Sequence, residues 1–181
     1  MNAEIYNSLA TLLSYPDGRT FRTCHPECGE GPAGAEVALF HESVRSLDLR
    51  QVQELFIGTF DLSPVCSLEM GWHLFGENYD RGLLLVKIRA LLRKHAIAES
   101  TELPDHLTYA LRLVPRMEAA EAEYFVEAIV LPAIAKMLSA FEGKKNPYEH
   151  VLDAVRNTLA ADFSGIQFST AAAGAELRVL A

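Results

Sequence analysis

The chain has 181 residues, of which 50% are hydrophobic and 22% are charged. This composition excludes a disordered chain, and at roughly 150 residues per domain it predicts one globular domain. Sixteen basic and 24 acidic side chains give a formal net charge of -8. Because this charge repels phosphates, we expect no nucleic-acid partner and no binding to anionic membranes, and a basic protein segment is the favoured partner.

Cysteine content and the amino terminus indicate a cellular location. The chain has 3 cysteines, an odd number that argues against a disulfide framework and fits a reducing compartment. Residues 1–4 show no basic region leading into an apolar stretch, so we expect no secretory signal. The longest uncharged apolar stretch, 128–135, is far below the roughly 20 residues of a membrane span. The sequence predicts a cytoplasmic protein without membrane insertion.

Apolar residues recur every three or four positions, which predicts an all-α fold. The expected helices cover residues 3–15, 35–47, 49–59, 63–74, 78–95, 102–115, 117–141 and about 15 residues from 146. Residues 17–34 are rich in Gly and Pro and predict a long loop. We therefore expect a single-domain bundle of about eight helices over 1–163, followed by a loosely ordered tail at 164–181.

Proline and capping residues determine several of these boundaries. Ser63 is a predicted N-cap with Pro64 at the first helical position, and Asn146 has the same role before Pro147. Pro132 removes a backbone donor inside the 117–141 segment, so a kink is expected there.

Candidate chemical groups are few. Cys24, His25 and Cys28 lie close together in the predicted loop, but a structural zinc site needs four ligands, so loop thiols without a ligand role are favoured over metal binding. Cys66 is interpreted as a small buried residue. The sequence contains no nucleophile elbow, P-loop or dinucleotide-binding glycine motif, and we expect no catalytic residues.

An acidic run on the 117–141 helix has two interpretations. Glu118, Glu121, Glu123 and Glu127 occur with no basic residue between Arg116 and Lys136. Such a run is usually a solvated helix face, and the alternative is a landing surface for a basic partner segment.

Two further patches combine carboxylates with aromatic or imidazole groups. Phe60 and Asp61 precede a segment that contains Ser67, Trp72, His73 and Phe75, and Asp105 and His106 follow Pro104. Such groups can form a polar rim around an apolar groove that binds a peptide. Helix capping and core packing remain the alternative for each patch taken alone.

Several motifs occur in one order along the chain. They are Leu12-Leu13-Ser14-Tyr15-Pro16, Leu55 to Leu62, Ser67-Leu68, Gly76-Glu77, Arg81-Gly82 and Glu102-Leu103-Pro104-Asp105-His106-Leu107. This pattern resembles the NarJ-type nitrate reductase assembly chaperones, which belong to the wider TorD/DmsD group. The resemblance covers about residues 1 to 115, and the last third matches only in being helical.

The resemblance implies an all-helical chaperone that binds the basic amino-terminal segment of a molybdoenzyme catalytic subunit until molybdopterin has been inserted. It implies no enzymatic activity and no cofactor or metal held by this chain. The client site it implies includes the Phe60-Asp61 corner and the turn from Glu102 to His106. Together with the two patches, the expected peptide-binding residues are Phe60, Asp61, Trp72, His73, Glu102, Pro104, Asp105, His106 and Tyr109.

Departures from the family pattern leave the client open. Glu69 stands where the family usually has an aromatic residue, and Trp72-His73 replaces the more usual tyrosine-containing pair. The client is therefore nitrate reductase or another member of the DMSO reductase class.

Other functions remain open at this point. One is a generic helical interaction or regulatory module, and another is a metal-handling protein that uses Cys24, His25 and Cys28. Chaperones of this kind can exchange helices between protomers, so a homodimer with a hinge in the 17–34 loop is also considered.

Overall fold

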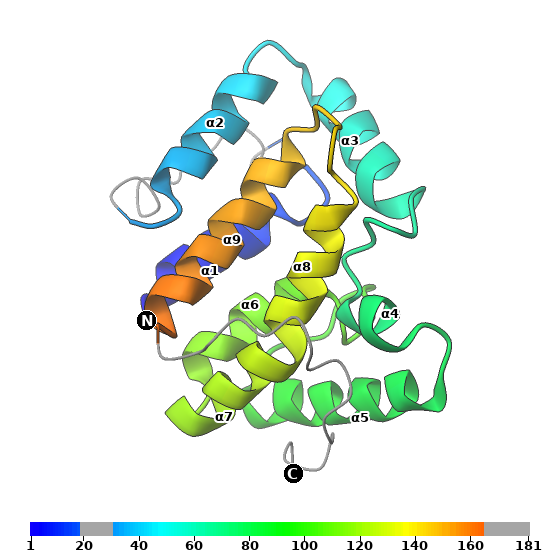
Figure 1. Cartoon of the computed structure of the whole chain (residues 1–181), viewed down its shortest axis with the longest axis vertical. Helices are drawn as coiled ribbons and strands as arrows, with labels where there is room; N and C mark the ends of the chain where they lie inside the picture. Colours follow the sequence, from blue (N-terminus) through cyan, green and yellow to red (C-terminus); the bar gives the residue numbers. More distant parts are fainter. Residues whose placement is uncertain (19–30, 165–181) are drawn as a thin grey trace.

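The computed structural model describes residues 1–18 and 31–164, and Figure 1 shows that helices dominate them. The α-helices are α1 (Ala3–Leu12), α2 (Gly34–Val44), α3 (Leu49–Phe56), α4 (Met70–Phe75), α5 (Tyr79–Lys94), α6 (Leu107–Leu113), α7 (Ala119–Phe125), α8 (Leu131–Ser139) and α9 (Tyr148–Asp162). Across these described ranges, the one pairing of extended backbone is an isolated bridge between Glu69 and His106. The all-α prediction is confirmed. Most of the predicted loop at 17–34 and residues 165–181 of the predicted tail lie outside the described residues.

Helix α9 packs against α1, α2 and α8 at the centre of the bundle (Figure 1). Val151, Leu152, Val155 and Leu159 recur at helical spacing and are fully buried. As predicted, the Asn146 side chain caps this helix, with its Oδ1 accepting the backbone N–H of Tyr148 over 3.0 Å.

The predicted start of a helix at Ser63 is wrong, because α4 begins only at Met70. The preceding backbone is extended where Met70 N–H donates to the Asp105 carbonyl over 2.9 Å and Leu107 N–H donates to the Leu68 carbonyl over 2.8 Å. Because of the same bridge, α6 starts later in the sequence than predicted. It begins at Leu107 rather than near Glu102, and His106 is its N-cap. The predicted end of α4 at Gly76 is confirmed. Gly76 has a φ of 59°, which glycine tolerates.

Two turns of π-helix interrupt the bundle. The first, η2 (Ile57–Asp61), continues α3, and its Leu62 N–H donates to the Ile57 carbonyl. The Asn146 side chain stabilises this turn by donating to Thr59 Oγ1 over 2.8 Å, across 87 positions of sequence. Phe60 and Asp61 are the last two residues of this turn.

The second π-turn, η4 (Val126–Val130), immediately precedes Pro132, where the sequence predicts an interruption. Leu131 N–H bonds to the Val126 carbonyl, five residues back, and the Pro132 ring follows without a donor. The segment predicted as one kinked helix is therefore α7, η4 and α8 in succession.

No helix in the described part of the chain combines the length and hydrophobicity that a membrane span requires.

Candidate functional site

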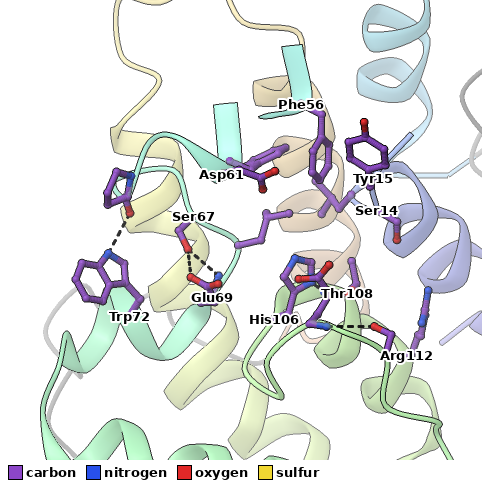
Figure 2. A pocket seen from close by; sticks show the side chains of 16 residues that line it. Ser14, Tyr15, Phe56, Asp61, Ser67, Glu69, Trp72, His106, Thr108 and Arg112 are labelled. Atoms are coloured by element: carbon purple, nitrogen blue, oxygen red, sulfur yellow. Dashed lines mark hydrogen bonds between the residues drawn. The ribbon is translucent and has the colours of Figure 1, made fainter. Parts of the chain in front are cut away.

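A cavity of about 440 Å³ opens where the end of α1, the α3–η2 corner, α4 and α6 meet. Figure 2 shows the 16 side chains that line it. The apolar part of the lining comprises Leu13, Tyr15, Phe56, Phe60, Pro64, Leu68 and Trp72. The polar part comprises Ser14, Asp61, Ser67, Glu69, Ser100, Glu102, His106, Thr108 and Arg112. The exposed lining is more polar than apolar, so the cavity can hold a peptide segment that combines a few apolar anchors with polar or charged groups.

An aromatic cluster forms one wall of the cavity. The rings of Phe56 and Phe60 have centroids 5.0 Å apart, and Phe60 lies 5.0 Å from Tyr148 of α9. Tyr15 meets Phe56 edge to face at 5.8 Å and remains 51% exposed. Phe56, Phe60 and Tyr148 are buried in the core, so Tyr15 is the ring of this cluster that is exposed for contact with a ligand.

Three carboxylates, those of Asp61, Glu69 and Glu102, share the cavity. Burial raises the pKa of Asp61, and the negative charge of Glu69 raises it further. Burial also raises the pKa of Glu102, with added repulsion from Asp61 and Glu69. Repulsion from neighbouring carboxylates is the smaller contribution to both shifts, and Arg112 is the one cationic side chain among the lining residues. The cavity therefore favours a cationic ligand group.

Glu69 is held in place by its neighbour two residues earlier. The Ser67 hydroxyl donates a short hydrogen bond to the Glu69 carboxylate, and the Glu69 backbone N–H donates to Ser67 Oγ over 3.2 Å. Figure 2 shows both bonds on the cavity wall. Glu69 is thus a central charge of the site. From the sequence, it was noted only as a departure from the family pattern.

His106 is a neutral imidazole at the cavity wall. Its Nδ1 lies 2.7 Å from Thr108 Oγ1 and accepts the Thr108 backbone N–H, which places the ring proton on Nε2. Burial is the main cause that lowers its pKa to about 4; Arg112 lowers it further, and Glu69 opposes the shift. Among the described residues, Nε2 has no hydrogen-bond partner, so His106 has one donor available for a ligand carbonyl or carboxylate.

Asp105 has a different position from the one the sequence suggests. Its side chain is fully buried and accepts a hydrogen bond from Arg81 Nε over 3.0 Å. The backbone of Gly71 passes so close that a Cβ there would lie 2.6 Å from Asp105 Oδ2. Asp105 therefore joins α4, α5 and the α6 N-terminus below the cavity, and it does not line the cavity.

Of the nine residues expected from the sequence, the structure brings Phe60, Asp61, Trp72, Glu102 and His106 together at the cavity. His73 faces a second, more open hollow of about 490 Å³ on the other side of Trp72 and Pro64. Its Nε2 donates to the Ser67 carbonyl over 2.6 Å. Tyr109 is 1% exposed, with its hydroxyl 2.9 Å from Ser100 Oγ. Pro104 is buried and lines neither hollow.

Several lining residues were not expected from the sequence, notably Tyr15, Phe56, Glu69, Thr108 and Arg112. Helical spacing was an available signal for two of them. Phe56 precedes the expected Phe60 by four residues, and Arg112 follows the expected Tyr109 by three, so each lies one helical turn from an expected residue. Tyr15 and Glu69 approach through tertiary contacts that no local pattern encodes.

Within residues 1–18 and 31–164, no group of three or more His, Cys, Asp or Glu side chains is placed to hold a metal ion. Cys24, His25 and Cys28 lie outside the described residues. Cys66 is a buried free cysteine, as expected.

Comparison with known proteins identifies the family. The family model described as nitrate reductase delta subunit matches residues 29–159. The nitrate reductase molybdenum cofactor assembly chaperone NarJ of Escherichia coli K12 is 26% identical over 157 residues, which cover 80% of this chain. The nitrate reductase-like protein NarX of Mycobacterium tuberculosis H37Rv is 24% identical over 169 residues, which cover 92% of this chain and 26% of that protein.

The family model matches more than half of the chain, so this protein belongs to the nitrate reductase delta subunit family. The matched part of the chain spans 65% of the length of the E. coli relative.

Proposed function

We propose that this protein is a cytoplasmic chaperone for the assembly of a molybdoenzyme catalytic subunit, and that the acidic cavity binds the basic amino-terminal segment of that subunit. The client is nitrate reductase or another enzyme of the DMSO reductase class. The family membership supports the first part of this proposal, because the E. coli relative bears the name of a nitrate reductase molybdenum cofactor assembly chaperone.

The observation that carries the second part is the lining of the cavity. Asp61, Glu69 and Glu102 surround an aromatic wall, so a segment with apolar anchors and a Lys or Arg side chain would satisfy both kinds of surface. The apolar contacts supply most of the binding free energy, while the carboxylates select for positive charge. A micromolar complex corresponds to about -8 kcal/mol, which one short amphipathic segment can reach.

This function needs no covalent step by the protein. Holding a segment of the client in the cavity keeps that part of the subunit out of its final contacts, and release allows folding to finish. We infer that the protein acts by reversible binding rather than as an enzyme.

Co-purification from the organism's own cells tests the chaperone function. We expect the tagged protein to recover the catalytic subunit of a molybdoenzyme lacking its cofactor, identified by mass spectrometry. Cells without the gene should contain that subunit with a reduced molybdenum content. Full molybdenum loading and full reductase activity in those cells would contradict the proposal and favour a general interaction module.

A further inference from the structure

A second apolar stripe runs along the outer face of α5, opposite the buried residues Leu84, Ile88 and Leu92. Tyr79, Leu83 and Val86 on this stripe are 77%, 37% and 66% exposed. The exposed Ala90 continues it after one more turn. Spacings of four, three and four residues place these side chains on one face of the helix. Helix α5 lies along one end of the molecule (Figure 1).

The charges beside this stripe differ between its two ends. The amino end carries Glu77 and Asp80, and the carboxyl end carries Arg89, Arg93 and Lys94. Arg89 and Lys94 also pair with carboxylates of their own chain, and Arg93 has no acidic partner among the described residues. The face is therefore acidic at its amino end and basic at its carboxyl end, and the apolar stripe lies between them with Lys87 beside Val86.

We propose that this face binds a second copy of the chain, with the two α5 helices antiparallel across a two-fold axis that passes between Leu83 and Val86. In this arrangement Leu83 of one protomer meets the partner's Val86, and all four apolar residues of each stripe are covered. The acidic end of each helix then lies beside the basic end of the other. A parallel pairing would bring the two basic ends together.

Charge complementarity favours a second copy over an anionic membrane as the occupant. The pairing of Arg89 and Lys94 with Glu99 and Glu121 reduces the positive charge available to a lipid surface. A helix of 16 residues is about 24 Å long. A contact confined to one face of a helix of that length buries less area than the roughly 1,200 Å² of a typical stable interface. We therefore expect a weak dimer, with a dissociation constant in the micromolar range or above.

Sedimentation velocity over a series from low micromolar to submillimolar concentration tests the dimer. The wild-type chain should shift from monomer to dimer, and Val86→Asp should raise the dissociation constant by at least about tenfold. Leu39→Asp is the matched control, because Leu39 is a similarly exposed apolar residue at 48%, located on α2. We expect the control to dimerise like the wild type.

Cross-linking tests the antiparallel geometry. In a background with Cys24→Ser and Cys28→Ser, a short bis-maleimide should join two copies of Val86→Cys, which lie near the axis. The same reagent should not join two copies of Arg93→Cys, which lie at opposite ends of an antiparallel pair. Efficient cross-linking of both variants would overturn this geometry.

A wild-type protein that stays monomeric at submillimolar concentration overturns the proposal, as does a dimer that Val86→Asp leaves intact. Binding of the monomer to phosphatidylglycerol vesicles that Val86→Asp abolishes would assign the face to a membrane instead. The stripe residues Tyr79, Leu83 and Val86 do not line the acidic cavity, so these outcomes are independent of the proposed function.

Discussion

Arg81 Nε donates to Asp105 Oδ2 over 3.0 Å, and this ion pair connects two motifs that lie 24 positions apart in the sequence. The Asp105 side chain is fully buried and that of Arg81 is 17% exposed. The backbone carbonyl of Asp105 also accepts the first N–H of α4, and the next residue, His106, caps α6. The pair therefore fixes the relative positions of the three helices below the cavity.

Removing one partner of this pair should destabilise the protein strongly. Burial raises the pKa of Asp105 even though Arg81 opposes the shift, so the carboxylate depends on Arg81 for its charge. We expect Arg81→Met to lower the free energy of unfolding by about 3 kcal/mol, because it leaves a buried charge without a partner. The double variant Arg81→Met, Asp105→Leu should lose less than the sum of the two single variants in urea denaturation. Additive losses would show that the two side chains are not coupled.

Gly71 should not tolerate a side chain, although it lies in a helix. An added Cβ would lie 2.6 Å from Asp105 Oδ2 and 3.0 Å from Arg81 Cγ. Alanine is a better helix former than glycine by about 1 kcal/mol, but overpacking of a buried contact typically costs 1 to 3 kcal/mol. We expect Gly71→Ala to destabilise the protein by about 2 kcal/mol in thermal or urea denaturation.

Gly82→Ala is the matched control for Gly71→Ala. Gly82 also lies in a helix, and an added Cβ there would meet no atom within 4 Å. This substitution should stabilise the protein by up to about 1 kcal/mol. If both substitutions changed the stability in the same direction, the close approach at Gly71 would not be a constraint.

Local sequence patterns predicted much of the fold, and they failed where distant contacts decide. The buried stripe of α5 and the break before Pro132 follow from spacing and from a missing donor. The start of α4 could not be predicted, because the Met70 backbone N–H donates its hydrogen bond to the carbonyl of Asp105, 35 positions later. A local N-cap signal at Ser63 competes poorly with that pairing.

The site was predicted by residue type better than by position. A carboxylate and an imidazole at the α6 N-terminus were expected, and the structure separates them into a buried Asp105 and a cavity-lining His106. The sequence contains no sign of this separation, because it depends on Arg81 and Gly71 approaching from other helices. The second apolar stripe of α5 has a helical spacing that is visible in the sequence, but spacing alone does not show which of the two stripes is buried.

Stability should fall on acidification through His106. Its pKa in the folded protein is about 4, against 6.5 for an unperturbed histidine. The unfolded chain therefore takes up a proton first, and stability is lost as the pH falls from about 6.5 towards 4, by up to about 3 kcal/mol.

His106→Asn isolates this titration, because asparagine can still cap α6 but does not bind a proton. We expect the stability advantage of the wild type over His106→Asn to shrink across that pH range, measured by urea denaturation at a series of pH values. Parallel stability curves for the two proteins would show that His106 does not titrate in this way.

Client binding should weaken at mildly acidic pH. The raised pKa values of Asp61 and Glu102 bring their protonation closer to neutrality, and a protonated carboxyl no longer attracts a cationic segment. Affinity for a basic amino-terminal peptide of the client should therefore begin to fall at a higher pH than it would with carboxylates of ordinary pKa. The variant Asp61→Asn, Glu102→Gln should show a flatter dependence in calorimetric titrations. An equal pH dependence in both proteins would place the titrating groups elsewhere.

The most direct test is calorimetric titration of the client's amino-terminal peptide against two variants with the same change in charge. One neutralises the cavity with Asp61→Asn, Glu69→Gln and Glu102→Gln; the other neutralises exposed carboxylates on and beside α7 with Glu118→Gln, Glu123→Gln and Glu127→Gln. Because these groups are partly solvated, each contributes up to about 1 kcal/mol, so the cavity variant should bind roughly 10- to 100-fold more weakly than the wild type. The α7 variant should bind like the wild type. Undiminished binding by the cavity variant, or an equal loss in both variants, would contradict a client site in the acidic cavity.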